Sequence, residues 1–232
     1  MGGATKSARS RARAELTQEI KDAARRQLRD VGAASLSLRA VAREIGMVSS
    51  AVYRYFPSRD DLLTALIVDA YDALGAAAEA TGAAHATDAP REQWLAVCRA
   101  VRSWAREHRH EYELVFGTPV PGYRAPQDTI RAAARVPIEL LRIVRSNSAA
   151  RDARNDPPLS APLLTDLARL REQAAPEVDE GTLARAVMAW TMLIGAISFE
   201  LFGHLNNVID DYEGWFDYVM GSRATDLGLA IT

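Results

Sequence analysis

The sequence predicts an all-α fold: an amino-terminal three-helix head with a helix-turn-helix, joined by a long helix to a carboxy-terminal helical bundle. Three observations support it. Apolar residues recur at helical spacing along almost the whole chain, without a convincing pair of strands. Residues 37–56 form two short helical segments around a glycine corner. Charge is also uneven, because residues 1–70 carry net +4 and residues 71–232 net −6, which suits a nucleic-acid-binding head on an acidic body.

Length and composition indicate a globular protein that can bury a substantial core, since 48% of its 232 residues are hydrophobic and 25% are charged. The single cysteine, Cys98, excludes an internal disulfide, and its apolar neighbours predict a buried thiol. The amino terminus is basic and lacks the apolar core of a secretory leader. The most apolar segment, Ala186–Phe199, is too short to cross a bilayer. We therefore expect a cytoplasmic protein without a membrane partner.

The first helix of the head is predicted over about Thr17–Val31, with its apolar face behind the helix-turn-helix and Gly32 at its end. We assign residues 1–15 to a flexible basic arm, residues 16–62 to the helix-turn-helix head and residues 63–232 to the helical body. The arm has basic side chains and no acid in its first 13 residues. Such an arm either reaches phosphates or a minor groove, or is a solvated terminus.

The helix-turn-helix is predicted from the spacing on both sides of Gly46. Val41, Ala42 and Ile45 form the apolar face of its first helix, and Gly46 follows where a helix end needs positive φ. The second helix, about Ser49 to Tyr55, is expected to bury Val52 and Phe56. Because Val48 has no side-chain oxygen, Ser49 is expected to cap it.

The remaining side chains of this segment give the predicted DNA contacts: Ser37, Arg39, Ser49, Ser50, Ala51, Tyr53, Arg54, Tyr55 and Arg59. Ser37 is also the expected N-cap of the first helix of the motif. Each assignment has an ordinary alternative. Arg39 can be solvated, Tyr55 can pack inside the head, and Arg59 can pair with a nearby carboxylate.

From about Glu19 to Ala70 the chain resembles the TetR family of bacterial transcriptional regulators. The signature is Tyr-Arg-Tyr-Phe-Pro-Ser-Arg-Asp-Asp-Leu-Leu over residues 53–63. Two positions depart from the family pattern: Leu36, where serine or threonine is frequent, and Val48, where serine is frequent. The resemblance implies a DNA-binding regulator that reads two half-sites as a homodimer and responds to a small molecule.

The body is predicted to be helical as well. After Pro57, Ser58 caps a helix that runs to about Ala80, and Gly75–Ala89 loosens towards a loop closed by Pro90. Residues 117–126 hold proline and glycine and form a constrained turn segment. Residues 146–162 form the clearest loop. The other predicted helices cover 91–107, a short stretch about 112–116, 128–145 with an interruption near Pro137, 163–173, 182–205 and 210–227.

This carboxy-terminal part resembles the WHG-type domain of a TetR subset at residues 116–123 and 190–204. The two resemblances imply that residues 16–62 are a DNA-binding domain and residues 63–232 an effector-binding and dimerisation domain. Aromatic residues and a methionine at helical spacing are candidates for an apolar effector pocket, although such a set is more often core. With one histidine, the candidate effector residues are Trp94, Trp104, Tyr112, Phe116, Trp190, Met192, Phe199 and His204.

The dimer surface is predicted on the last two helices, which offer more apolar area than one helix pair can bury. An intramolecular core would use much of the same set. The candidate dimer residues are Ala186, Ala189, Leu193, Ile197, Phe202, Leu205, Trp215, Phe216, Val219 and Met220.

Little in the sequence supports catalysis. His108 and His110 are two residues apart and therefore face different directions on a helix, so we expect no metal site there, and no cofactor motif is present. We expect a non-enzymatic, DNA-binding transcriptional regulator, most simply a repressor that a small ligand releases from a pseudo-palindromic operator. The rival is a helical ligand-binding or scaffold protein that never contacts DNA.

Overall fold

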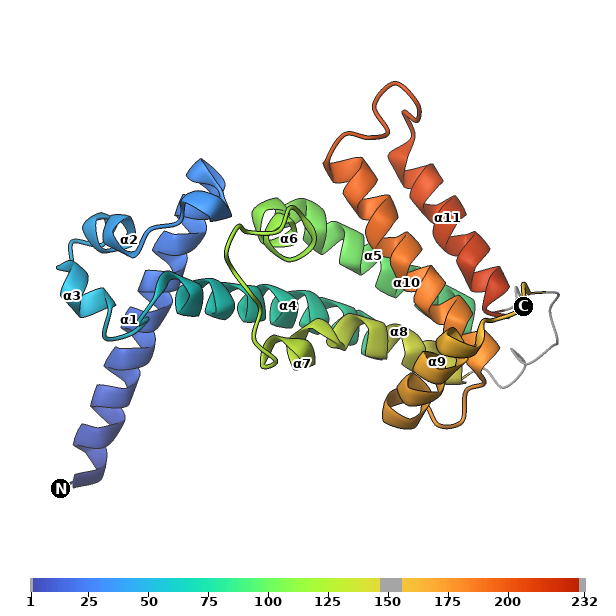
Figure 1. Cartoon of the computed structure of the whole chain (residues 1–232), viewed down its shortest axis with the longest axis horizontal. Coiled ribbons are helices and arrows are strands. Elements are labelled where there is room, and N and C mark those ends of the chain that lie inside the picture. Colours follow the sequence, from blue (N-terminus) through green and yellow to red (C-terminus); the bar gives the residue numbers. More distant parts are fainter. Residues whose placement is uncertain (1, 147–155, 230–232) are drawn as a thin grey trace. The chain divides into compact units, whose positions relative to one another are not determined.

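The computed structural model describes residues 2–146 and 156–229, with side chains from residue 8 onward, and the described residues contain helices and no strands (Figure 1). The chain forms two compact units. The first comprises Met1–Tyr71 and His108–Ile130, and the second comprises Asp72–Glu107 and Arg131–Thr232. These units differ from the predicted division at residue 62, because residues 63–71 and 108–130 group with the head.

The first unit contains α1 (Gly2–Val31), the 3-10 turn η1 (Ala33–Ser35), α2 (Leu38–Glu44), α3 (Ser49–Val52), the first part of α4 (Arg59–Ala84) and α6 (Arg109–Phe116). Its core joins one face of α1 to the helix-turn-helix and to the start of α4, because their buried apolar side chains form one cluster. That cluster contains Ile20, Ala23, Ala24, Leu28, Leu36, Leu38, Val41, Ala42, Val52, Phe56, Leu62, Leu63 and Leu66.

Helix α1 is much longer than predicted, because it begins at Gly2 and not near Thr17. Residues 4–16 contain neither proline nor glycine and are rich in alanine and arginine, so nothing in them ends a helix. The predicted flexible arm is therefore helical. Arg9, Arg11 and Arg13 lie exposed on it, and the Arg13 guanidinium carbon lies 5.1 Å from the centroid of the Tyr55 ring.

The second unit contains the rest of α4, α5 (Pro90–Glu107), α8 (Arg135–Ser146), α9 (Ala161–Ala174), α10 (Glu180–Leu201) and α11 (Tyr212–Asp226). Helices α10 and α11 pack side by side (Figure 1). Trp94 of α5 is buried and donates from its indole nitrogen to the carbonyl of Met220 at 3.1 Å. Arg102 forms a two-point hydrogen bond with Glu200 at 2.6 and 2.9 Å. Cys98, on the same helix, is fully buried, and burial raises the pKa of its thiol.

We predicted that helix α4 loosens from Gly75 onward. Instead, it continues to Ala84. The glycines have a packing role, because both face side chains of α8. A Cβ placed on Gly75 would lie 2.6 Å from the Arg135 Cβ, and one on Gly82 would lie within van der Waals overlap of the Glu139 carboxylate. Arg135 in turn pairs with Asp72 and Glu79 of α4. Glycine therefore allows close approach of two helices here and does not end one.

The interruption predicted near Pro137 is confirmed. Helix α7 (Thr129–Ala133), which spans the division between the units, ends at Ala133 and α8 begins at Arg135. Proline has no N–H for the carbonyl four residues earlier, which is that of Ala133. Residues 147–155 of the predicted loop lie outside the described residues. The last two helices are confirmed with shifted ends, and aspartates cap both: Asp179 accepts from the Thr182 N–H and Asp211 from the Gly214 N–H.

Replacing Gly75 tests the packing role of this glycine. We expect Gly75→Ala to lower the free energy of unfolding by about 1–2 kcal/mol, because overpacking costs about 1–3 kcal/mol and exceeds the gain of about 1 kcal/mol in helix propensity. Urea unfolding measures the change. In an Arg135→Ala background the penalty should shrink in part, because the Nε and Cδ atoms at 2.8 and 2.9 Å are removed while the Cβ remains. A Gly75→Ala variant more stable than the parent would contradict the packing role.

Candidate nucleic-acid interface

The corner of the helix-turn-helix has the predicted geometry. Gly46 has φ +69°, in the left-handed region that favours glycine. The Met47 N–H donates to the Ala42 carbonyl at 2.8 Å and the Gly46 N–H to the Arg43 carbonyl at 3.3 Å, which is the Schellman pattern. Ala42 is buried in the same cluster as Val52 of α3. The corner thus fixes the direction in which α3 leaves α2.

Helix α3 turns its apolar side chains inward and its polar ones outward, as predicted. Val52 and Phe56 are buried, whereas Ser50, Tyr53 and Arg54 are exposed and Ser49 and Ala51 are half-buried. The α-helix is shorter than expected, ending at Val52. The next turn is tighter, since the Arg54 and Tyr55 N–H groups bond to carbonyls three residues back.

The N-terminus of α3 corrects one prediction. Ser49 is the first helical residue and does not cap, and Val48 occupies the N-cap position without a side-chain hydrogen bond. The Val48 side chain is 71% exposed beside the outward serines. Sequence reasoning did not include it among the DNA contacts, although an apolar residue at the tip of an exposed helix was the available signal.

Ser37 is the N-cap residue of α2, as predicted, but its hydroxyl makes no capping hydrogen bond. Instead, its backbone N–H donates to the buried side chain of Gln27 on α1 at 3.3 Å. The half-buried hydroxyl is therefore not committed to the cap.

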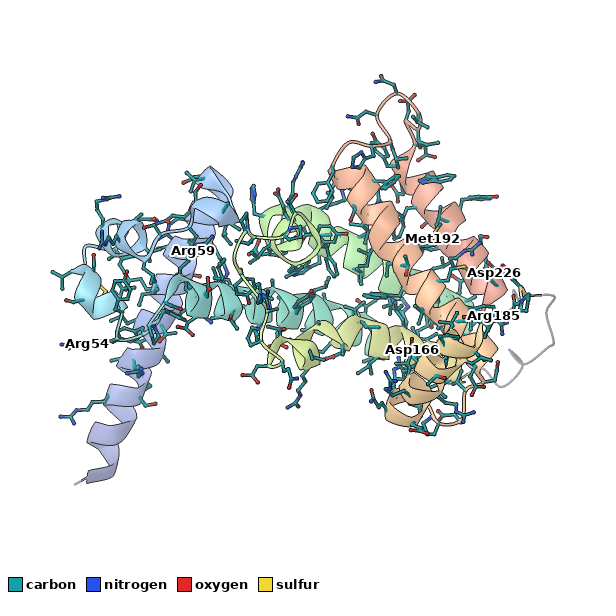
Figure 2. All side chains as sticks on the ribbon, in the orientation of Figure 1. Arg54, Arg59, Asp166, Arg185, Met192 and Asp226 are labelled. Carbon is teal, nitrogen blue, oxygen red and sulfur yellow. The ribbon has the colours of Figure 1, made fainter. Side chains whose placement is uncertain are left out.

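Three arginines project from the motif into solvent. Arg39 and Arg43 lie on α2. Arg54 follows α3 (Figure 2). Within residues 8–146 and 156–229 their guanidinium groups form no hydrogen bond or ion pair, whereas the nearby Arg26 is paired with Glu44. Arg43 was not predicted as a contact. Its spacing of four from Arg39 on one helix would have indicated it.

Arg59 has a different role from the one predicted. Its guanidinium donates to the backbone carbonyls of Leu36 at 3.2 Å, Ala33 at 2.8 Å and Ala34 at 3.1 Å, and lies 3.7 Å from Asp60. The group is thus committed inside the first unit and is not a free phosphate clamp. Tyr55 is half-buried against the core and lies under Arg13, which agrees with the internal alternative.

The eight candidate effector residues do not form one group. Tyr112 and Phe116 belong to the first unit, where their ring centroids lie 5.0 Å apart, and the other six belong to the second. Trp94 and Trp104 are buried in the core, whereas Met192 (Figure 2), Phe199 and His204 are exposed. Aromatic spacing on a helix does not distinguish a core face from an outer face, which is why the set divides.

The candidate dimer residues need a similar correction. Seven of them are buried within the unit itself and offer no surface to a partner: Ala189, Leu193, Ile197, Leu205, Phe216, Val219 and Met220. Ala186 and Phe202 are half-buried, and Trp215 is partly exposed. Six large apolar side chains of α10 and α11 are exposed, and of these only Trp215 was predicted to lie at the dimer surface. The six are Val187, Met188, Met192, Phe199, Trp215 and Tyr218. We call these six residues the α10–α11 face.

Helix α10 is, among the described residues, the one helix with the length and hydropathy of a membrane span, and only 33% of its apolar window is buried. The α10–α11 face accounts for that low burial. Within the same residues, no cluster of three or more metal-ligating side chains occurs.

A short outward helix held at a glycine corner, with uncommitted arginines beside it, defines a helix-turn-helix DNA-binding protein. Family models agree and are more specific. The model described as bacterial regulatory proteins, tetR family, matches residues 20–66, and the one described as tetracyclin repressor-like, C-terminal domain, matches residues 94–222. The chain belongs to the TetR family of bacterial transcriptional regulators, and its role is that of a DNA-binding regulator. The narrower WHG-type resemblance stays a prediction.

Individual relatives support this assignment. The HTH-type transcriptional regulator Rv1816 of Mycobacterium tuberculosis is 40% identical over 194 residues, which are 83% of either chain. The regulator Mb1846 of Mycobacterium bovis matches equally. The crystal structure of SCO4313 is 33% identical with a TM-score of 0.78, covering 93% of this chain and 98% of that one. The TetR-family regulator PfmR of Thermus thermophilus, 19% identical over 87% of this chain and 96% of its own, shares the fold with a TM-score of 0.53.

Two arginines five residues apart should respond differently to the same change. We expect Arg59→Met to lower the free energy of unfolding by about 1–2 kcal/mol, because three carbonyls lose a charged donor that is partly screened by solvent. Arg54→Met should change it by less than about 0.5 kcal/mol, because its guanidinium is exposed and uncommitted. Thermal and urea unfolding of the two variants measure this. Equal destabilisation by both would argue against the structural role of Arg59.

Proposed function

We propose that this regulator is a repressor that binds a pseudo-palindromic operator as a homodimer and is released by a small-molecule ligand. One observation carries the DNA-binding mode: the exposed face of α2 and α3 holds Arg39, Arg43 and Arg54 without acidic partners among the described residues. Desolvating arginines already paired with acids would cost binding energy, and unpaired ones are ready for phosphate or guanine. The protein would act wherever its operator DNA is held, which for a bacterial regulator is the cytoplasm.

The contacts divide by chemistry. The α3 end with Val48, Ser49 and Ser50 would enter the major groove, where the serine hydroxyls can bond base edges and the exposed valine can pack on a thymine methyl. Tyr53 and Ser37 have hydroxyls suited to phosphate oxygens. Arg39 and Arg54 would add charge contacts on either side. The proposed set thus keeps most predicted residues, adds Val48 and Arg43, and assigns Arg59 to structure.

Dimerisation would use the α10–α11 face in place of the buried residues first predicted. Two antiparallel helices that each leave apolar side chains outward can form a four-helix bundle with a second copy. Met188, Met192 and Phe199 occur at helical spacing along α10, and Trp215 and Tyr218 stack on α11 with centroids 6.0 Å apart. A symmetric dimer would give two recognition helices for two half-sites.

Ligand release requires that the ligand prefer a dimer whose two heads no longer match the operator spacing. Helix α4 supports this proposal, because it runs without a break from the first unit into the second. The rival function, a helical scaffold without DNA, predicts no selective retention of any upstream sequence. If no compound in a broad screen changed the affinity for the operator, release by a small ligand would be contradicted.

DNA binding is tested with the DNA upstream of the coding region of the protein. We expect Arg39→Met and Arg54→Met each to weaken operator binding about tenfold and to reduce the salt slope by about 1, because each loses one phosphate or base contact. Fluorescence anisotropy at several salt concentrations measures both quantities. Arg131→Met, at an exposed arginine of α7, is the matched control and should change neither. Full retention by an Arg39→Met/Arg54→Met double variant would favour the scaffold.

The dimer surface is tested by placing charge on it. We expect Met188→Glu and Phe199→Glu each to weaken self-association at least a hundredfold, because a buried unpaired carboxylate in an apolar interface is costly. Sedimentation velocity across a concentration series measures the change. Ile130→Glu, at a still more exposed apolar position outside α10 and α11, should leave the dimer intact. Dimers that survive both substitutions would place the interface elsewhere.

A further inference from the structure

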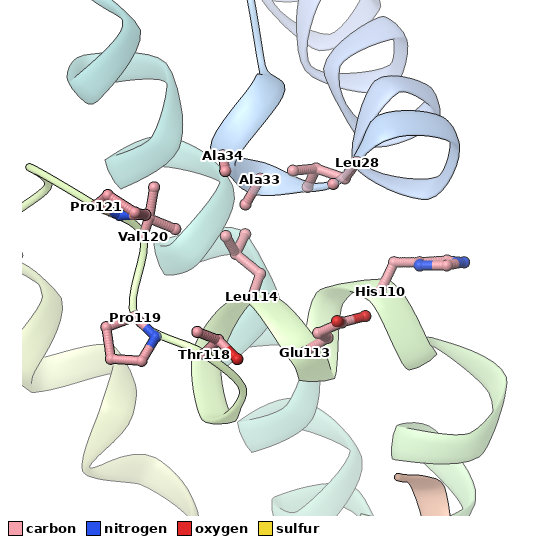
Figure 3. Close-up of a pocket in the computed structure, with 11 residues that line it drawn as sticks. Leu28, Ala33, Ala34, His110, Glu113, Leu114, Thr118, Pro119, Val120 and Pro121 are labelled. Carbon is pink, nitrogen blue, oxygen red and sulfur yellow. The ribbon is translucent and has the colours of Figure 1, made fainter.

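A pocket of roughly 300 Å³ lies within the first unit, between the end of α1 and α6 (Figure 3). One wall is the end of α1 with η1, contributing Leu28, Gly32, Ala33 and Ala34. The opposite wall is α6 and the segment after it. This second wall consists of His110, Glu113, Leu114, Thr118, Pro119, Val120 and Pro121. None of the eight predicted effector residues lines it.

Hydrogen bonds within the first unit hold both walls of the pocket. The Gly117 N–H donates to the Glu113 carbonyl at 2.9 Å and closes the last turn of α6, and Pro119 and Pro121 restrict the segment that follows. Tyr123 then anchors this segment to α4, with its hydroxyl 2.9 Å from that of Thr64. On the other wall, Arg59 holds the carbonyls of Ala33 and Ala34.

The lining combines an apolar surface with one acidic edge. In Figure 3 Leu114 points towards Ala33 and Ala34, and the carboxylate of Glu113 lies with His110 at one side of the pocket. Within the described residues, Glu113 forms no ion pair, while the neighbouring Glu111 is the acid that approaches Arg25, at 3.8 Å. A carboxylate without a cationic partner beside apolar walls suits a ligand that carries its own positive charge.

We propose that this pocket binds a small organic cation: one ring or short branched chain, packed on Leu28, Leu114 and Val120, with a protonated amine at Glu113. The volume is at the lower end of ligand pockets, which fits about ten non-hydrogen atoms. The site belongs to the DNA-binding unit itself, so it differs from an effector site in the helical body.

Occupancy would act on the DNA-binding face through η1. The ligand would contact Ala33 and Ala34, and two residues later Leu36 leads into Ser37, the N-cap of α2. Arg59 bonds to this same stretch, so a ligand that shifts it alters the start of α2. This coupling rests on the proposed DNA-binding function, whereas binding of the cation does not.

The test uses full-length protein without DNA and two probes of the same shape, 2-phenylethylamine, which is protonated at pH 7, and neutral 2-phenylethanol. We expect saturable binding of the amine, with the alcohol about fivefold weaker, because the solvent-exposed carboxylate of Glu113 adds a modest charge contact. Glu113→Gln should remove that difference. Glu15→Gln, at an exposed acid of α1, should preserve it.

Calorimetry gives the affinities, and methyl NMR of alanine-labelled protein places the ligand through shifts at Ala33 and Ala34. Thr118→Trp, which fills the pocket from an exposed position, should abolish binding in a folded protein. Absence of saturable binding, equal affinities for the two probes, unchanged discrimination in Glu113→Gln, or shifts confined to other alanines would each overturn the proposal. Operator binding is measured separately without probe, so loss of DNA binding and loss of the cation site are distinguishable.

Discussion

The arrangement of the first unit depends on one guanidinium group, that of Arg59. It bonds to three carbonyls of the stretch between α1 and α2, and it belongs to the first turn of α4. One side chain therefore ties together the end of α1, the start of α2 and the start of α4. The Gly46 corner fixes α3 relative to α2, and Arg59 acts together with the shared apolar core and the Gln27–Ser37 hydrogen bond to hold α2 on α1. The exposed face for DNA and the pocket behind it share this support.

Much of the fold follows from local signals in the sequence. The Gly46 corner, the break before Pro137 and the aspartate-capped closing helices are all set by residues within a few positions of the feature. Gly75 was misjudged because glycine marks both a helix end and a close helix–helix contact, and only the position of Arg135 separates the two. The start of α1 was missed because helix-permissive residues carry no stop signal.

In the candidate site, too, features set by neighbouring residues were predictable, whereas those set by tertiary contacts were not. Alternation of Val52 and Phe56 with polar neighbours fixed the outward face of α3 correctly. Arg54 and Arg59 lie in similar sequence surroundings. The Arg54 guanidinium is solvated, whereas that of Arg59 donates hydrogen bonds to carbonyls 23 to 26 residues away. Helices α10 and α11 are apolar on more than one side. Periodicity alone therefore could not decide which apolar residues face inward and which, such as Met188 and Phe199, remain outside.

The buried thiol of Cys98 has a practical consequence for following this protein in solution. The chain has a single sulfhydryl, and its environment in the core of the second unit suppresses the nucleophilic thiolate. A maleimide dye would consequently not react with Cys98 in the folded protein and would react with it once that core unfolds. Spectroscopic labels attached through a cysteine introduced near α3 would then report on the DNA-binding unit alone, because Cys98 would carry no second label.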